Sequence, residues 1–528
     1  MATSVCAAAT QLVMARVLLV GLAFLCLGCF ADKKQPNIVF ILTDDQDVVL
    51  GGLTPMTKTK KLLGDAGLTF SNMFTTSPLC CPSRSSILTG NYVHNHGALN
   101  NSISGNCSSP AWQDGAEKNT FITYVKQMGY STFFAGKYLN QYGDKLAGGV
   151  EHIPPGWDWW IGLVHNSVYY DYTLSVNGTA EKHGKDYKTD YLTDLLSRKA
   201  QDFLTLQNEN NPFFMMISTP ACHAPFDSAP QYVKNFTNKK APRTPSYNKH
   251  GSDKHWLVRS QKTPMLNVSV QDTDDIFRKR WRTLLSVDDL VEGVVNTLQD
   301  KKLLDNTYIV FSSDNGYHLG QFSMPRDKRQ LYEFDIRVPL IVRGPNVPAG
   351  KICDEPVLNI DLAPTFVELS GHEVPSNVDG RSLLTLLHPG KSKVGISNKW
   401  REDFLVEHTG EYEPDGHYKP CKNTGNMAAC DILDCVCQDS KNDTYSCRRT
   451  MTDKENLMYC EFNDKESFVE MYDLDKDPSQ LKNIIKEVDP KVIEKQNQRL
   501  IMLSICQGAS CRQVGPIGQH WSGDPDRE

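Results

Sequence analysis

The chain lacks the features that would tie it to nucleic acid or hold it in a membrane. Its 528 residues carry 56 lysines and arginines against 62 aspartates and glutamates, and the formal net charge is -6. Charge therefore provides no overall attraction to nucleic acid, and an anionic partner must be bound by a local basic site. The apolar run near the start, residues 17–29, spans only ~20 Å as a helix, against a hydrocarbon core of ~30 Å. We expect no stable membrane anchor.

This short apolar run indicates processing instead. It follows a segment, Met1 to Arg16, with one positive charge, and it gives way to Asp32-Lys33-Lys34. That order is typical of a cleaved secretory signal, and we assign residues 1–31 to it. Leu27-Gly28-Cys29 would also suit a bacterial lipoprotein, which remains the alternative.

The cysteines lack the two CxxC pairs of a common zinc site, and the predicted compartment is oxidising, so disulfides are favoured. Of 16 cysteines in the chain, Cys6, Cys26 and Cys29 would leave with the signal, and the 13 that remain are an odd number. The pairing stays open. Eight lie in the last quarter: Cys421, Cys430, Cys435, Cys437, Cys447, Cys460, Cys506 and Cys511.

Asn-x-Ser/Thr triplets are frequent, and each is a candidate glycosylation site in a secreted chain. They begin at Asn100, Asn106, Asn177, Asn235, Asn267 and Asn442. Together with the signal, they predict a eukaryotic secretory route.

The pattern of apolar runs predicts an α/β fold, with neither an internal repeat nor a low-complexity tract. Continuous β-branched runs are typical of buried parallel strands, and we expect strands at residues 37–43, 213–218, 308–312 and 339–343. Apolar residues at helical spacing over residues 277–300 predict a helix. We assign residues 32–395 to a catalytic domain, and residues 396–528 to a cysteine-rich α+β subdomain.

Two of the predicted strands end in pairs of oxygen-bearing side chains. Asp44 and Asp45 follow the first strand, and Asp314 and Asn315 follow the strand near residue 310. Ligands bind at the carboxyl ends of strands in open α/β sheets. If the two strands are neighbours, the four side chains form a site for a hard cation such as Ca²⁺ or Mg²⁺. The alternative is ordinary turn chemistry, in which Asp and Asn end strands.

A second cluster lies in the stretch SPLCCPSRSSILTG, residues 77–90. Pro82 and the hydroxyl residues after it predict the start of a helix. Cys80 would then lie at the N-terminal end, where an anion is favoured by about 0.3 to 1 kcal/mol. Arg84, one turn later, would face the same place, so we expect a nucleophile beside an anion-binding pocket.

The motif Cys80-Cys81-Pro82-Ser83-Arg84 resembles the signature C-x-P-S-R of the sulfatase family. The resemblance implies an alkaline-phosphatase-like α/β domain with a mostly parallel sheet, and a smaller C-terminal domain with an antiparallel sheet. It also implies one bound Ca²⁺, held by Asp44, Asp45, Asp314, Asn315 and residue 80.

In this family the first cysteine is converted to Cα-formylglycine by a formylglycine-generating enzyme, which implies the same for Cys80. The chemical reason is turnover. One hydroxyl of the hydrated aldehyde attacks sulfur, and the other expels sulfate as the aldehyde reforms.

Further positions match family motifs one by one. Lys137 and Lys328 resemble the two sulfate-binding lysines, and His223 resembles the histidine near the leaving group, a general acid. One departure is clear, because Leu139 and Asn140 stand where many sulfatases have a histidine. His94, His96 and His318 are candidates for that role, and His94 and His318 are also candidates for contact with the sugar.

Gly136 to Asn140 and Pro154 to Trp157 resemble the branch that removes 6-O-sulfate from N-acetylglucosamine (glucosamine) residues. That branch implies a lysosomal enzyme acting at the non-reducing end of heparan sulfate and keratan sulfate. The alternatives are another glycan sulfatase, a phosphatase or phosphodiesterase of the same fold, and a non-catalytic glycan-binding protein. An endosulfatase is less favoured because a long basic insertion is missing.

The oligomeric state stays open, with a homodimer as one alternative. Two basic stretches, residues 239–262 and 277–282, are either solvated surfaces or contacts for an anionic glycan.

Overall fold

The structure is a computed structural model that describes residues 34–389, 400–411 and 440–513. The predicted signal and the predicted domain boundary at residue 396 lie outside these ranges, as do Cys421, Cys430, Cys435 and Cys437. Contacts between residues divide the chain into two units at Pro36, and the second is Asn37–Glu528. All the helices and strands described belong to the second unit.

A ten-stranded sheet forms the centre of this unit. The apolar, β-branched composition of its middle strands suits strands covered on both faces. In spatial order the strands are β11 (Lys351–Cys353), β2 (Leu68–Phe70), β10 (Leu340–Arg343), β9 (Thr307–Ser313), β1 (Asn37–Thr43), β8 (Phe213–Ser218), β4 (Ser131–Lys137), β5 (Trp159–Leu163), β6 (Thr173–Val176) and β7 (Thr179–Lys182).

The middle of the sheet is parallel, as predicted. β1 pairs in parallel with β9 and with β8, and β4 pairs in parallel with β8 and with β5. The carboxyl ends of these five strands therefore lie at one edge of the sheet. β10, the predicted strand at residues 339–343, instead runs antiparallel to β9, because a short apolar run carries no information on direction.

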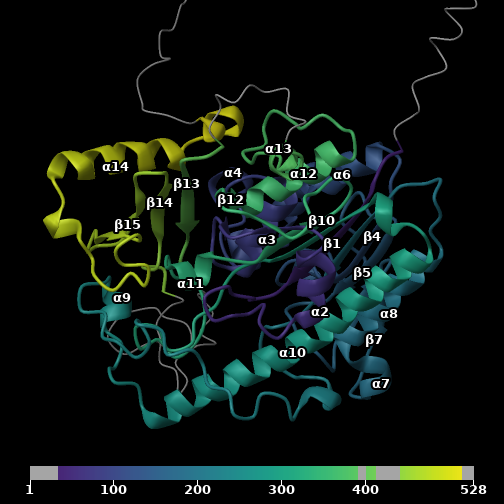
Figure 1. Ribbon diagram of the computed structural model, residues 1–528, viewed down its shortest axis with the longest axis horizontal. Helices are drawn as coiled ribbons and strands as arrows, with labels where there is room; N and C mark the ends of the chain where they lie inside the picture. Colours follow the sequence, from purple (N-terminus) through teal and green to yellow (C-terminus); the bar gives the residue numbers. More distant parts are fainter. Residues whose placement is uncertain (1–33, 390–399, 412–439, 514–528) are drawn as a thin grey trace, which may run out of the picture. The chain divides into compact units, whose positions relative to one another are not determined.

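Helices cover both faces of the sheet (Figure 1). Alternate residues of β1 point to opposite faces, as the two-residue period of a strand requires. Ile38 and Phe40 pack with α3 (Cys80–Thr89), α6 (Phe121–Gln127) and α12 (Leu362–Leu369). Val39 and Ile41 pack with α8 (Leu192–Thr205) and α10 (Asn267–Asp300). The predicted helix at residues 277–300 is the second half of α10.

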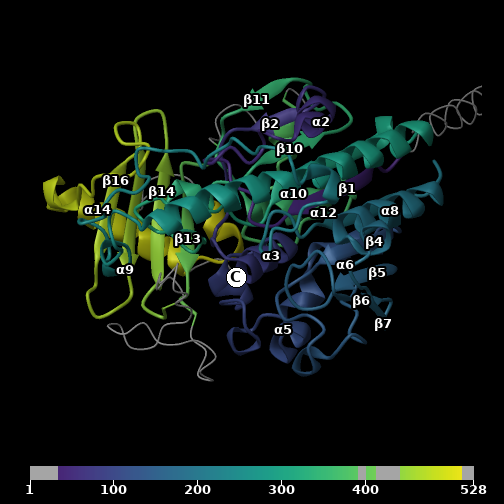
Figure 2. The ribbon, with the colours of Figure 1, turned by 90° about the horizontal axis from the view of Figure 1, so that it is seen from below.

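The C-terminal part forms a separate antiparallel sheet beside α14 (Figure 2). The predicted α+β arrangement is therefore confirmed. Cys447 lies opposite Cys460 in register, and the two form a disulfide. Within the described ranges, no helix is both long and apolar enough to cross a membrane. The elements are β13 (Asp403–His408), β14 (Tyr445–Met451), β15 (Asn456–Phe462), β16 (Val469–Asp473) and α14 (Pro490–Ser504).

Shorter elements connect these layers, and two of them, β3 and β12, form a small parallel sheet. They are α2 (Thr57–Thr59), β3 (Met73–Phe74), α4 (Val93–His96), α5 (Pro110–Asp114), α7 (Tyr187–Asp190), α9 (Trp256–Arg259), α11 (Glu333–Ile336), β12 (Val357–Leu358) and α13 (Leu384–Leu387).

Candidate active site

The two predicted carboxylate pairs lie side by side. Thr43 of β1 is in register with Ser313 of β9, so the residues that follow each strand meet at the same edge. The backbone N–H of Asp45 donates to Oδ1 of Asp314 over 3.0 Å, and Nδ2 of Asn315 donates to Oδ1 of Asp45 over 2.7 Å. Asp44 is also fully buried. We call Asp44, Asp45, Asp314 and Asn315 the strand-end cluster.

This cluster fits a hard cation. Carboxylate oxygens of Asp44, Asp45 and Asp314 all lie within 4.8 Å of one another, and the buried Oδ1 of Asn315 has no hydrogen-bond partner. Burial and the charge of Asp44 raise the pKa of Asp314 to about 7. A cation among these oxygens would offset that repulsion, and an all-oxygen donor set suits Ca²⁺ or Mg²⁺.

Cys80 is the first residue of α3, as predicted, and faces the cluster. Leu79 precedes the helix in an extended conformation, and Sγ of Cys80 lies 3.8 Å from Oδ1 of Asp44. Burial raises the pKa of the Cys80 thiol to about 12, so the helix N-terminus does not make it an anion. Position 80 as a cysteine therefore holds a protonated thiol near neutral pH.

Arg84 lies one turn along α3 and is buried with the cluster. Its Nε donates to Oδ2 of Asp314 over 2.8 Å, and its Nη1 donates to the carbonyl of Lys137 and to Oγ of Ser218. Its buried Nη2 has no hydrogen-bond partner and lies 3.8 Å from Oδ1 of Asp44. One N–H group therefore remains able to bind an anion.

The two predicted lysines come from different parts of the chain. Lys137 ends β4 and donates to Oδ2 of Asp44 over 2.7 Å, and Lys328, in the loop before α11, donates to both carboxylate oxygens of Asp45 over 2.7 and 2.8 Å. Burial would raise the pKa of Asp44, but Lys137 and other nearby cations outweigh it and lower that pKa well below its usual range.

His223 lies in the loop after β8, near the solvent side of the cluster. Its Nε2 is 4.0 Å from Oδ2 of Asp45, and its side chain is 15% exposed. Burial lowers its pKa despite the neighbouring Asp44 and Asp45, so the imidazole is neutral at neutral pH. Its side chain is more exposed than those of Arg84, Lys137 and Lys328.

The other candidate histidines have partners of their own. His94 lies 2.9 Å from Glu407 and 2.9 Å from the carbonyl of Cys506, on the side of the C-terminal sheet. Nδ1 of His318 faces Asp335, and its buried Nε2 has no hydrogen-bond partner. His96 contacts Ser86, and burial lowers its pKa to about 3. Their roles with a sugar stay predictions.

The sequence did not predict three buried residues that lie near the cluster. Oγ of Ser167 donates to Oδ2 of Asp44 over 2.5 Å, and Ser218 accepts from Arg84. Arg280 of α10 donates to the carbonyl of Asp45 and to Oδ1 of Asp47. No motif marks the two serines, whereas the helical period would have placed Arg280 on the inner side of α10.

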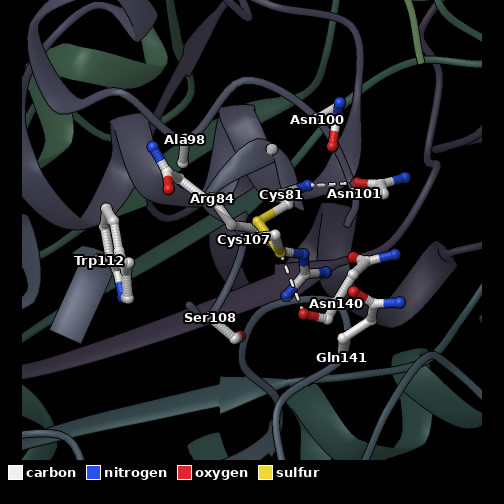
Figure 3. Close-up of a disulfide and its surroundings, with 12 residues drawn as sticks. Cys81, Arg84, Ala98, Asn100, Asn101, Cys107, Ser108, Trp112, Asn140 and Gln141 are labelled. Carbon is white, nitrogen blue, oxygen red and sulfur yellow. Dashed lines mark hydrogen bonds between the residues drawn. A yellow bond between two sulfur atoms is a disulfide. The ribbon is translucent and has the colours of Figure 1, made fainter. Parts of the chain in front are cut away.

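Cys81, the second cysteine of the doublet, forms a disulfide with Cys107 (Figure 3). Its backbone N–H donates to Oδ1 of Asn101 over 2.9 Å. The two adjacent cysteines therefore differ in environment, since Cys80 is a free thiol and Cys81 anchors the start of α3. Cys506 and Cys511, whose pairing the sequence left open, form a further disulfide, while Cys222 and Cys353 are free thiols.

Part of each basic stretch pairs with carboxylates or is buried. Arg243 pairs with Asp274, Lys279 with Asp275, and Lys254 is buried against Tyr472. The predicted glycosylation sites differ in exposure. Asn177, Asn235 and Asn267 are exposed, Asn106 and Asn442 are half-buried, and Asn100 is buried; glycosylation of all six stays a prediction.

Solved structures share this fold. BT4656 in complex with its substrate D-glucosamine-2-N,6-O-disulfate matches with a TM-score of 0.70 and 25% identity, over 89% of this chain and 97% of that one. A phosphonate monoester hydrolase from Silicibacter pomeroyi matches with a TM-score of 0.64 and 19% identity, over 88% of this chain and 94% of that one. The fold is thus that of the alkaline-phosphatase-like hydrolases.

The sequence comparisons narrow this class. A family model described as Sulfatase matches residues 36–372. The human N-acetylglucosamine-6-sulfatase is 52% identical over 95% of this chain and 90% of its own length. A Drosophila melanogaster extracellular sulfatase SULF-1 homolog is 46% identical over 72% of this chain and 34% of its own length. The chain belongs to the sulfatase family.

Proposed function

We propose that this sulfatase hydrolyses the 6-O-sulfate ester of N-acetylglucosamine residues at the non-reducing end of heparan sulfate and keratan sulfate. The identity of 52% to the human N-acetylglucosamine-6-sulfatase, extending over 95% of the chain, supports this substrate. The observation that carries the chemistry is Cys80 at the start of α3, 3.8 Å from Asp44 and beside Arg84.

We propose that Cys80 is the precursor of Cα-formylglycine. With a pKa of about 12, the thiol itself would be a poor nucleophile at neutral pH, because the thiolate is the reactive form. The hydrated aldehyde supplies one hydroxyl for attack on sulfur and a second that expels sulfate. Conversion requires a formylglycine-generating enzyme as a partner during maturation.

The chain's own residues have separate tasks in this proposal. The strand-end cluster holds one Ca²⁺, a Lewis acid for the sulfate oxygens. Lys137, Lys328 and the free Nη2 of Arg84 bind the sulfate and balance its charge in the transition state. His223, near the solvent side, takes up a proton from the solvent and, as the imidazolium, passes it to the leaving sugar oxygen. We also propose a secretory route to the lysosome, on the strength of the signal-like segment.

Three substrates of one sugar test the reaction class. We expect sulfate release from 6-sulfated N-acetylglucosamine. We expect little hydrolysis of the 6-phosphate ester or of a phosphonate monoester. The phosphonate matters because phosphonate monoester hydrolases share the fold. Faster hydrolysis of either phosphorus substrate would refute the proposal.

A pair of oligosaccharides tests the position of attack. One carries a 6-sulfate only at its non-reducing end, and the other carries it only on an internal residue. We expect release from the first alone. Release from the internal position would favour an endosulfatase, in line with the extracellular relative in Drosophila melanogaster.

Thermal unfolding measured with EGTA and with added Ca²⁺ tests the cation apart from activity. Calcium that binds the folded state should stabilise it, by about 2.7 kcal/mol at 100 times its dissociation constant. We expect this stabilisation to vanish in Asp314→Asn. Equal stabilisation of that variant would place the cation elsewhere.

A further inference from the structure

The loop that carries Lys328 has an unfavourable backbone on both sides of this residue. Asp327 has a φ of 135° and Arg329 a φ of 86°, although neither is glycine. Residues held in sparsely populated backbone regions persist only when the surroundings fix them. Lys328 itself is buried, with Nζ on both oxygens of Asp45. Something outside the loop must therefore hold it in this conformation.

One restraint comes from the active-site side of the loop. The backbone N–H of Arg329 donates to the carbonyl of Pro78 over 3.1 Å, two residues before Cys80. This bond links the two segments that carry Lys328 and Cys80.

Several further restraints come from the C-terminal sheet and the turn before β14. Tyr445 of β14 donates its hydroxyl proton to the carbonyl of Arg329 over 2.8 Å. Nε2 of Gln330 donates to Asp443 over 3.1 Å, and the hydroxyl of Tyr332 donates to Glu470 of β16 over 3.0 Å. Arg449 of β14 pairs with Glu333 over 3.0 Å, where α11 lies beside β14 (Figure 1).

Among the bonds from the C-terminal sheet, the Tyr445 bond is the one nearest to Lys328 along the chain. Tyr445 is 1% exposed, so no water replaces its hydroxyl on the Arg329 carbonyl. Burial and nearby carboxylates raise its pKa well above the usual range, which keeps it a donor. Its bond reaches the carbonyl of Arg329, the residue that directly follows Lys328.

We propose that Tyr445 is a positioning residue, through which the C-terminal sheet holds Lys328 against Asp45 for the sulfatase reaction. This inference rests on the role of Lys328 in the proposed function. It also gives the C-terminal sheet a task in catalysis, since the sheet supplies the donor that the strained loop needs. Removing the hydroxyl would let the ammonium group shift from the place where it binds the transition state.

The test is a double-mutant cycle of Tyr445→Phe and Lys328→Ala, assayed on 6-sulfated N-acetylglucosamine. Tyr445→Phe should lower kcat by about 10-fold to 100-fold and change KM less. In the Lys328→Ala background it should lower kcat no further, because the positioned group is gone. Thermal unfolding of each variant reports on folding separately.

Tyr459→Phe is the matched control. Tyr459 lies in β15 of the same sheet and is also buried, but its hydroxyl donates to Glu461 of its own strand. Its removal should leave kcat unchanged. If Tyr445→Phe does not fold, Tyr332→Phe carries the same cycle, because it removes the next bond between the loop and the sheet.

Two results would overturn the inference: unchanged kcat in Tyr445→Phe, or the same fold-loss with and without Lys328. Full activity of Lys328→Ala alone would instead refute the role of Lys328 in the proposed function. The two failures are therefore distinguishable.

Discussion

At the carboxyl ends of β1 and β9, three buried carboxylates face Arg84 and two lysines, whereas in the C-terminal sheet the carboxylate of Asp403 pairs with two arginines. Asp403 accepts from Arg448 over 2.9 Å and from Arg499 over 2.8 Å. At the strand-end cluster, by contrast, Nη2 of Arg84 and Oδ1 of Asn315 have no hydrogen-bond partners. A buried charged group whose polar atoms all have partners contributes to stability. A buried charged group with polar atoms that lack hydrogen-bond partners can bind a cation or an anion.

The largest expected effect is a loss of activity, without a loss of stability, at the strand-end cluster. Cys80→Ala should lower kcat by about 10⁴-fold or more, because the nucleophile is lost. Its free energy of unfolding should change little, since no partner of Cys80 is left with an unpaired charge. Steady-state kinetics and urea unfolding of the same preparation measure both. Activity within 10-fold of the wild type would place the nucleophile elsewhere.

The second prediction is the opposite result for the C-terminal sheet, a loss of stability without a loss of activity. Asp403→Asn removes one carboxylate from buried Arg448 and half-buried Arg499, which should lower the free energy of unfolding by about 3 kcal/mol and leave kcat unchanged. Asp453→Asn is the control, because Asp453 is exposed and should cost less than about 0.5 kcal/mol. Equal values for both variants would mean that the closed ion pair adds nothing to stability.

The third prediction compares the cross-links of the two regions. Cys81–Cys107 closes a separation of 26 residues and Cys506–Cys511 one of 5. Chain entropy then predicts losses of about 3.5 and about 2 kcal/mol for the two alanine double variants. Chemical denaturation measures both. A larger loss of stability for the C-terminal pair would show that local packing, rather than loop closure, determines how much each disulfide stabilises the protein.

The smallest effect concerns His94, which joins α4 to β13. Burial would lower its pKa, but Glu407 and the charge of Asp379 raise it above the ordinary 6.5. A raised pKa in the folded state gives stability that is present below the unfolded pKa and is lost as pH rises through the folded value. His94→Gln should therefore destabilise by less than about 1 kcal/mol, and more at pH 5 than at pH 8.5. The opposite trend would mean that His94 is neutral.

Much of the site follows from the sequence because it depends on local patterns. The runs at residues 37–43 and 213–218 are β1 and β8 with the same bounds, and parallel neighbours bring their carboxyl ends together. The pairs at residues 44–45 and 314–315 meet for that reason. Cys80 starts α3 because Pro82 and the hydroxyl residues after it favour a first helical turn.

The rest depends on contacts between distant segments. Ser167 reaches Asp44 across 123 positions, and Tyr445 reaches Arg329 across 116. Neither serine nor tyrosine carries a pattern that would reveal such a partner. Arg280 shows a different limit, because it lies within a basic run but is buried, while Arg278 and Arg282, two positions away on either side, are only half-buried.

The mass of the peptide that contains Cys80 tests the central claim most directly, when measured on protein that desulfates 6-sulfated N-acetylglucosamine. We expect oxygen in place of sulfur and two hydrogens at position 80, with the adjacent Cys81 still linked to Cys107. An intact Cys80 thiol in fully active protein would contradict the account.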